Sequence, residues 1–176
     1  MLELDILLQT FSEDTARLGR FDQVTAKDMP SAYRTLLAHN NHMTVTVEAC
    51  HGCPVNVEVI ASKREANLYC REIMLRRSSD DGVVQYGIVR LDLNALEAEV
   101  RDEILSEKIP LGRVLIQCNV LRQVELLDLY RIHCGESLAQ FFGVPVETVT
   151  FGRTALIHFN GNPALELLEI IAPLPV

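Results

Sequence analysis

Residues 67–93 read NLYCREIMLRRSSDDGVVQYGIVRLDL, two apolar, alternating segments on either side of the run SSDDG. Alternation with a period of two is typical of β-strands, and Asp and Gly between two such segments favour a tight turn. The stretch therefore predicts an antiparallel hairpin, which limits the fold to one that contains an antiparallel sheet.

Two more pairs of alternating segments are each joined by a short run containing glycine and proline, which predicts two more hairpins. The first pair is MTVTVEA (43–49) and VNVEVIAS (55–62), and the second is ETVTFGRTALIHF (147–159) and ALELLEIIAP (164–173). VLRQVELLDLYRI (120–132) is predicted as a further strand, although its middle part could also form a helix.

Helical segments are expected between the hairpins. They are FSEDTARLGRF (11–21) with Ser12 as N-cap, PSAYRTLLAHN (30–40), NALEAEVRDEILSEK (94–108) with Asn94 as cap, IPLGRVLI (109–116) as a loop entering another element, and ESLAQFFG (136–143) closed by Gly143. Strands in hairpin order with helices inserted between them indicate an α+β fold with one antiparallel sheet. At 176 residues, the chain is predicted to form one domain, residues 1–176.

Charge and composition exclude several classes of function. The net charge of −8 gives no global basis for binding nucleic acid, and no apolar run is long enough for a membrane helix. The first 15 residues lack the basic region and cleavage site of a signal peptide. The five cysteines are interpreted as reduced thiols in a cytoplasmic protein, and no exposed apolar stripe asks for a partner, so a monomer is expected.

Arg71 is the first candidate site residue. In a regular strand it shares a face with Tyr69, Ile73 and Leu75, so its guanidinium lies among large apolar side chains. There it could offer a bidentate fork to a carboxylate in a dry environment. A structural ion pair or a solvated outer face is the simpler interpretation, and the pattern alone favours it.

Glu169 occupies a similar position, with Leu165, Leu167 and Ile171 on its face. A carboxyl group in an apolar pocket is more easily kept protonated, which makes Glu169 a candidate proton donor. The alternative is that Glu169 simply neutralises Arg71. Glu166 lies an odd number of residues away and is expected on the opposite face.

The motif CHGC (50–53) raises the possibility of a zinc or redox site. A structural zinc site needs a second pair of ligands, and the sequence has no second C-x-x-C and no paired histidines. A hairpin turn is therefore the preferred interpretation, and no metal is expected. No P-loop, dinucleotide fingerprint or nucleophile elbow is present either.

Taken together, five stretches in this order resemble the chorismate lyase (chorismate pyruvate-lyase, 4-hydroxybenzoate synthase) family, especially its divergent branch. They are LLAHNNHMT (36–44), YCREIMLRR (69–77), IPLGRVL (109–115), GRTALIHFNGNPAL (152–165) and LEIIAP (168–173). The most specific parts are the Arg-Glu strand, the Pro-Leu-Gly turn and the glutamate of the last strand.

The resemblance implies an antiparallel sheet with two flap-like helical segments that close over an internal pocket. It also implies removal of pyruvate from chorismate to give a hydroxybenzoate, without metal or cofactor. By the same resemblance, Arg71 would bind the ring carboxylate, Leu111 and Gly112 in the Pro-Leu-Gly turn would contact the ligand, Glu169 would be the acid beside the departing oxygen, and Met43 would line the pocket.

The sequence departs from the characterised branch at Ile88, where that branch carries an arginine. Arg153 and Arg122 are the candidates to supply the second cation, and Glu166 is kept as a minor alternative to Glu169. Two other functions stay open. The chain could be a non-catalytic binder of an aromatic carboxylate, because effector domains of GntR-type regulators share this fold, or a thiol or metal protein acting through Cys50 and Cys53.

Overall fold

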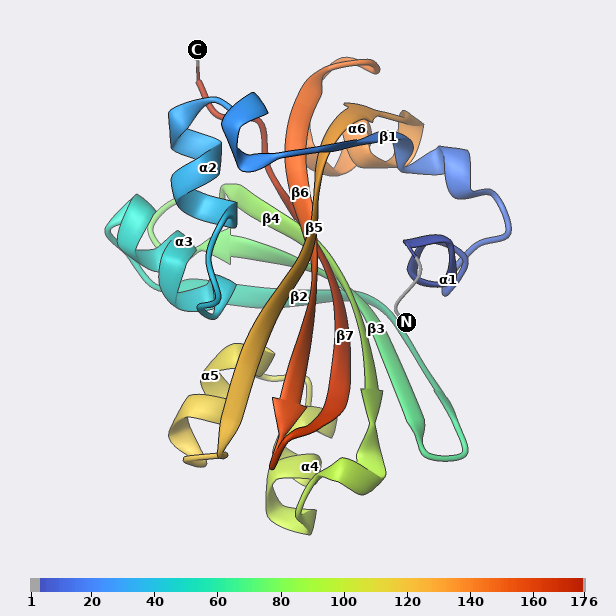
Figure 1. Ribbon diagram of the computed structural model, residues 1–176, viewed down its shortest axis with the longest axis vertical. Helices are drawn as coiled ribbons and strands as arrows, with labels where there is room; N and C mark the ends of the chain where they lie inside the picture. The colour runs from blue at the N-terminus through green and yellow to red at the C-terminus, as the bar shows by residue number, and fades with distance from the viewer. Residues whose placement is uncertain (1–3, 176) are drawn as a thin grey trace.

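The computed structural model describes residues 4–175 and contains one antiparallel sheet of seven strands, in the order β1-β5-β6-β7-β4-β3-β2 (Figure 1). The strands are β1 (Gly19–Val24), β2 (Val55–Glu65), β3 (Leu68–Arg77), β4 (Val83–Asp92), β5 (Arg122–Cys134), β6 (Val149–Phe159) and β7 (Asn162–Ile171). This confirms the predicted α+β class with a single antiparallel sheet. Residues 1–3 and 176, the ends of the predicted domain, lie outside the described residues.

The helices divide between the two faces of this sheet. Within residues 4–175 they are α1 (Leu4–Leu8), α2 (Ser31–Leu37), α3 (Met43–His51), α4 (Ala98–Leu105), α5 (Leu111–Gln117) and α6 (Glu136–Phe142), with 3-10 turns at Thr15–Arg17, Ala26–Asp28 and Leu93–Ala95. We call the face that α2, α3, α4 and α5 cover the near face, and the face that α1 and α6 cover the far face (Figure 1). The two predicted flaps correspond to α2–α3 and α4–α5.

The strand pattern explains why both faces are buried. β3 and β4 are buried at most positions, as expected for central strands with helices on both sides. On the far face, Tyr86 donates a hydrogen bond to Glu72 at 2.5 Å, and Glu72 also pairs with Arg17 at 3.0 Å. This pair fastens the segment before β1 to the middle of the sheet.

Residues 43–49, predicted as a strand, instead form the first part of α3. The buried side chains are Met43, Thr44 and Val47, a helical spacing, and the helix ends at Gly52, whose φ of 65° is the left-handed conformation of a C-cap. The alternation of β-branched residues was misleading because packing overrides their weak helix propensity. The CHGC motif is therefore a helix end and not a hairpin turn.

The predicted helix over residues 11–21 is also wrong. Ser12 accepts a hydrogen bond from the Asp14 amide in a turn, Thr15–Arg17 forms a single 3-10 turn, and Gly19–Val24 forms β1. The segment becomes a strand because it pairs along its length with the exposed edge of β5. The other two predicted hairpins, the β5 strand and the helices at α2, α4 and α6 are confirmed, although α4 begins after Glu97 and not at Asn94.

Candidate functional site

A small, partly enclosed cavity of about 50 Å³ lies between the near face of the sheet and the first turns of α3 and α5. Residues of the sheet form its floor: Val57, Arg71, Ile73, Leu75, Gln85, Gly87, Val89, Ile157, Leu167, Leu168 and Glu169. Two short segments form its roof: His42, Met43 and Thr44 at the start of α3, and Pro110, Leu111 and Gly112 at the start of α5. Of the predicted site residues, this cavity brings together Arg71, Glu169, Met43, Leu111 and Gly112.

Strand register fixes the arrangement of the floor. Arg71 on β3 lies opposite Val89 on β4. Two residues before Val89 on β4, Gly87 lies opposite Glu169 on β7. Because side chains two residues apart share a face, the alternation recognised in the sequence is what directs Arg71 and Glu169 to the same side of the sheet.

The Arg71 side chain is only 1% exposed, and its Nε and Nη1 atoms have no hydrogen-bond partner within the described residues. Burial lowers the pKa of the Arg71 guanidinium, and the nearby oxygens of Tyr69 and Glu107 act in the opposite direction. Leaving a buried charged donor unsatisfied is unfavourable, so native proteins rarely do it without a functional reason. The unpartnered guanidinium makes the cavity a candidate site for an anion.

Glu169 is paired with Arg153 and not with Arg71. Arg153 Nε donates to Glu169 Oε2 at 2.7 Å, while its Nη atoms donate to the backbone carbonyls of His39 at 2.8 Å and Asn41 at 3.0 Å. The hypothesis that Glu169 neutralises Arg71 is therefore wrong. The role of Glu169 as a proton donor stays a prediction.

Arg153 itself is not brought to the cavity. It is fully buried on β6, and its donors are taken up by Glu169 and by the connection between α2 and α3, including the Leu37 carbonyl at 3.3 Å. The structure thus gives this predicted ligand-binding residue partners of its own. Its contribution to the site is to hold the α2–α3 flap and the Glu169 carboxylate in place.

The roof is closed by a close approach of two helix ends. A Cβ atom added at Gly112 would lie 3.0 Å from Thr44 Oγ1 and 3.6 Å from His42 Nδ1. A glycine at this position therefore lets the start of α5 lie directly against the start of α3. The glycine of the Pro-Leu-Gly turn thus allows the close packing of α5 against α3.

Two residues that the sequence singled out face away from the cavity. Glu166 forms an ion pair with Arg90 at 2.7 Å on the far face, so Glu166 is not an alternative to Glu169. Ile88 is fully buried in the far-face cluster that packs against α1 and α6. The substitution of isoleucine for the arginine of the characterised branch therefore does not remove a cation from the near face of this structure.

Sequence reasoning missed two residues of the site, Gln85 and His42. Gln85 could have been found from its position, because it lies two residues before Gly87 on the same face of β4. His42 precedes α3 directly, but nothing in its sequence surroundings marks it as a site residue, since the helix itself was not predicted.

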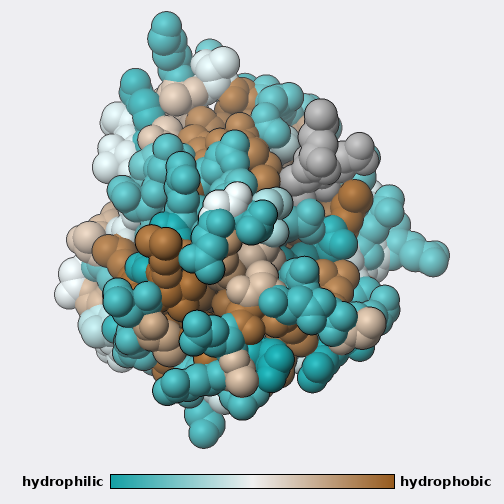
Figure 2. All heavy atoms as spheres, turned by 60° about the horizontal axis from the view of Figure 1, so that its bottom comes forward, coloured by the Kyte–Doolittle hydropathy of each residue, from teal (hydrophilic) through white to brown (hydrophobic). Residues whose placement is uncertain are grey.

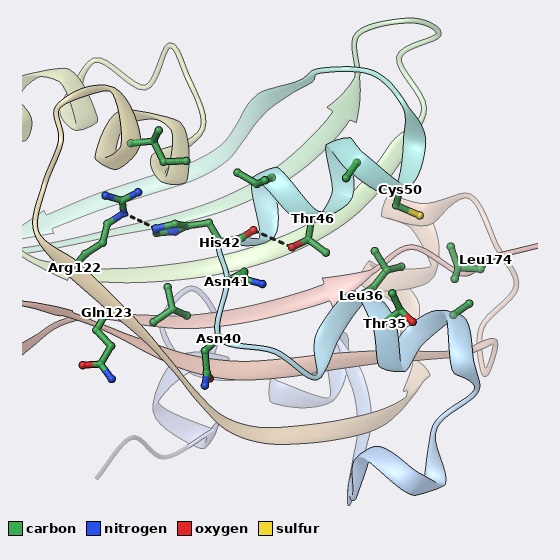
Figure 3. A pocket seen from close by; sticks show the side chains of 15 residues that line it. Thr35, Leu36, Asn40, Asn41, His42, Thr46, Cys50, Arg122, Gln123 and Leu174 are labelled. Atoms are coloured by element: carbon green, nitrogen blue, oxygen red, sulfur yellow. Dashed lines mark hydrogen bonds between the residues drawn. The ribbon is translucent and has the colours of Figure 1, made fainter.

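His42 also lines an open groove of about 1040 Å³ on the outer side of the roof, between α2, α3 and β5 (Figure 3). There Arg122 Nε donates to His42 Nε2 at 2.6 Å (Figure 3). Burial, followed by the charges of Arg122 and Arg153, lowers the pKa of His42 to about 4. His42 is thus neutral at physiological pH and lines both the groove and the cavity.

The surface around the groove carries exposed apolar side chains, among them Val45, Ile116 and Leu121. Figure 2 shows the molecule turned so that the bottom of Figure 1 comes forward, and on this face hydrophobic and hydrophilic residues are interspersed.

Cys50 is exposed and lines the groove, whereas Cys53 accepts a hydrogen bond from Ser79 at 3.5 Å. Within residues 4–175, no group of three or more His, Cys, Asp or Glu side chains is placed to hold a metal ion. No helix of the described part of the chain is long and apolar enough to cross a membrane.

The fold is similar to that of ligand-binding domains of bacterial regulators. The effector domain of PhnF from Mycobacterium smegmatis matches with a TM-score of 0.53 at 9% identity, over 75% of this chain and 88% of that chain. The ligand-binding domain assigned to a GntR-family transcriptional regulator from Bordetella bronchiseptica matches with a TM-score of 0.52 at 11% identity, over 66% of this chain and 85% of that chain. No protein-family model and no curated protein sequence matches the chain. At these identities the likeness concerns the fold, which is that of GntR-type effector domains.

Proposed function

We propose that this protein binds a small carboxylate in the cavity under α3 and α5, with Arg71 as the residue that holds the carboxylate group. The observation that carries the proposal is the buried Arg71 guanidinium, whose Nε and Nη1 have no partner within residues 4–175. A carboxylate bound at this guanidinium would accept charge-assisted hydrogen bonds from it. The apolar floor around it favours a ligand with an apolar body, such as an aromatic ring.

The size of the cavity means that binding requires a movement. A volume of about 50 Å³ is room for one or two water molecules and not for an aromatic acid. The roof consists of two helix ends, which contact each other at Gly112 and Thr44. An outward movement of α3 and α5 would enlarge the cavity without disturbing the sheet. The fold shared with effector domains of regulators supports a binding role of this kind.

A second candidate function is a cofactor-free lyase that acts on chorismate. It is favoured by the presence of Arg71, Glu169, Met43, Leu111 and Gly112 around one cavity. In that reaction the ether C–O bond breaks, a ring carbon loses a proton, and the enolpyruvyl group takes up a proton and leaves as pyruvate. Arg71 would orient the ring carboxylate, and Glu169, held in place by Arg153, would exchange a proton with the substrate or orient its ring hydroxyl.

The proposal includes the setting of the protein. We infer a single domain that acts as a cytoplasmic monomer on a small molecule and needs no cofactor. Among the described residues the five cysteines are free thiols, and Cys70 and Cys134 are buried, which supports a reducing compartment.

The experiment is a titration of benzoate, 4-hydroxybenzoate and chorismate by calorimetry, with pyruvate release followed in parallel. The variant is Arg71→Met, and the matched control is Arg90→Met, an arginine of the neighbouring strand that faces away and pairs with Glu166. Binding that is lost in Arg71→Met and kept in Arg90→Met supports the proposal. Pyruvate and a stoichiometric hydroxybenzoate, lost also in Glu169→Gln, would establish the lyase. Binding without turnover leaves the binding function alone, and equal binding by both arginine variants overturns the proposal.

A further inference from the structure

Gln85 is a second polar side chain in the cavity floor without a partner. It lies on β4, is 3% exposed, and its Oε1 atom has no hydrogen-bond partner among the described residues. Buried side-chain amides in folded proteins are nearly always hydrogen-bonded, so an unpartnered one that faces a cavity indicates a group that is missing from the cavity. No known or proposed role of the site so far uses Gln85.

The register of the sheet places Gln85 and Arg71 at opposite ends of the floor. Gln85 lies opposite Leu75 on β3, whereas Arg71 lies opposite Val89 on β4. Gln85 and Val89 are four residues apart on one strand, a separation of about 13 Å between their backbones. The long Arg71 side chain covers part of that distance, and a ligand body would lie over the remainder.

Gly87, the floor residue between these two ends, has no side chain to project into the cavity. Gly87 lies midway along β4 on the same face, and its neighbours are Ile73 on β3 and Glu169 on β7. An added Cβ at Gly87 would lie 3.3 Å from the Leu168 carbonyl oxygen and 3.5 Å from Ile73 Cδ1, so a side chain there would press on its neighbours. The floor thus has an arginine at one end, a residue without a side chain in the middle and an amide at the other end.

The two unpartnered groups are complementary in kind. Arg71 offers donors, Nε and Nη1, and Gln85 offers an acceptor, Oε1. A molecule that satisfies both must carry an anionic acceptor at one end and a hydroxyl or amino donor at the other. A plain carboxylate such as benzoate would satisfy Arg71 and leave Gln85 buried and unpaired.

We propose that Gln85 is a specificity-determining residue, which selects ligands that carry a hydroxyl or amino group opposite their carboxylate. The inference rests on the proposed carboxylate binding at Arg71 and names the class of ligand for that site. A site built to hydrogen-bond a hydroxyl group rejects analogues that lack it, because its own polar group is then left unpaired. Selection by Gln85 is therefore strongest in the closed state, in which water is excluded.

The competing explanation is a trapped water molecule. A cavity of about 50 Å³ can hold a water that donates to Gln85 Oε1. In that case Gln85 would be satisfied whatever the ligand, and it would not discriminate between ligands.

The test uses two pairs of acids that differ only in the hydroxyl group: 4-hydroxybenzoate with benzoate, and 3-(4-hydroxyphenyl)propionate with 3-phenylpropionate. The two lengths sample the separation between Arg71 and Gln85. Dissociation constants are measured by calorimetry for the unchanged protein, for Gln85→Leu and for Gln85→Glu. The control is Gln23→Leu, an exposed glutamine of β1 that donates to Asp128 outside the site.

In at least one pair, the unchanged protein and the Gln23→Leu control are expected to prefer the hydroxy acid by about 10- to 100-fold. Gln85→Leu is expected to reduce that preference to about threefold or less and to bind the plain acid at least as well. Gln85→Glu keeps an acceptor and is expected to retain part of the preference. Thermal unfolding of each variant shows that the protein is folded.

The outcomes separate this inference from the proposed function. Acids that bind through Arg71 with the same hydroxy preference in Gln85→Leu as in the unchanged protein overturn the role of Gln85 and leave carboxylate binding in place. The same conclusion follows if neither pair shows a preference, which is the result expected of a trapped water. If none of the four acids binds, both the inference and the proposed function are wrong.

Discussion

Arg153 donates a hydrogen bond to Glu169 at 2.7 Å, and this buried pair sits beside the cavity in which Nε and Nη1 of Arg71 have no partner among the described residues. Glu169 is therefore neutralised by Arg153 and not by Arg71. The carboxylate whose charge acts on Arg71 is that of Glu107, which accepts a hydrogen bond from Tyr69. The buried donors of Arg71 that this arrangement leaves unsatisfied are the physical basis for expecting an anionic ligand.

Arg71→Met is expected to stabilise the protein in the absence of ligand by about 1–3 kcal/mol, because it removes a buried unpaired charge and keeps most of the side-chain volume. The same substitution should weaken carboxylate binding by about 100-fold or more. Urea unfolding with and without 4-hydroxybenzoate measures both effects. A variant that is less stable than the unchanged protein without ligand would mean that Arg71 has a structural partner, and the charge argument would be wrong.

Arg153→Met should have the opposite effect on stability. It leaves Glu169 buried without its partner and removes the hydrogen bonds to the backbone between α2 and α3, so we expect a loss of about 3–5 kcal/mol. Glu169→Gln keeps an acceptor for Arg153 and should cost less. Urea unfolding of both variants gives the stabilities. Hydrogen exchange of residues 37–42 should accelerate in Arg153→Met and stay nearly unchanged in Glu169→Gln.

Gly112→Ala should separate the two halves of the roof, because the new Cβ would lie 3.0 Å from Thr44 Oγ1. We expect a destabilisation of about 1–3 kcal/mol, typical of overpacking, together with faster release of bound ligand. Thr44→Ala removes the opposing atom, so the double variant should recover much of the loss. Stabilities of the two single variants and the double variant form the cycle. Simple additivity of the two substitutions would contradict direct packing of α3 on α5.

His42 should contribute to the acid sensitivity of the protein. Its pKa is lowered from 6.5 to about 4 in the folded state, so between these values the unfolded chain binds a proton that the folded protein does not. This part of the stability is fully present above pH 6.5 and is lost as the pH falls toward 4. His42→Asn should therefore flatten the dependence of the unfolding free energy on pH in this window.

Arg122→Gln provides the comparison for His42. Because the charge of Arg122 helps to lower the pKa of His42, its removal should raise that pKa toward 6.5. NMR titration of the His42 ring measures the pKa directly. An unchanged pKa of His42 in Arg122→Gln would mean that burial and the charge of Arg153 are responsible.

Much of the sheet could be predicted because local sequence determines strands with strong alternation. The pair β3–β4 and the pair β6–β7 are hairpins of consecutive strands, and their turns carry the residues that turns require. The prediction of a strand at residues 43–49 was wrong for the opposite reason. Their alternation satisfies the strand template, whereas the choice of a helix depends on packing against α2, α5 and the sheet, which is not a local property.

The sequence by itself determined that Arg71 and Glu169 are surrounded by apolar residues on their own faces, because a strand places side chains two residues apart on one side. Only the tertiary structure decided which charges meet. The register between β6 and β7 places Arg153 opposite Glu169. In the order of the sheet, β4 with Gly87 lies between β7, which carries Glu169, and β3, which carries Arg71. These pairings depend on strand register and on the order of strands in the sheet, and the alternation of apolar residues specifies neither. The same holds for Gln85, an ordinary strand residue in the sequence, which only the assembled cavity deprives of a partner.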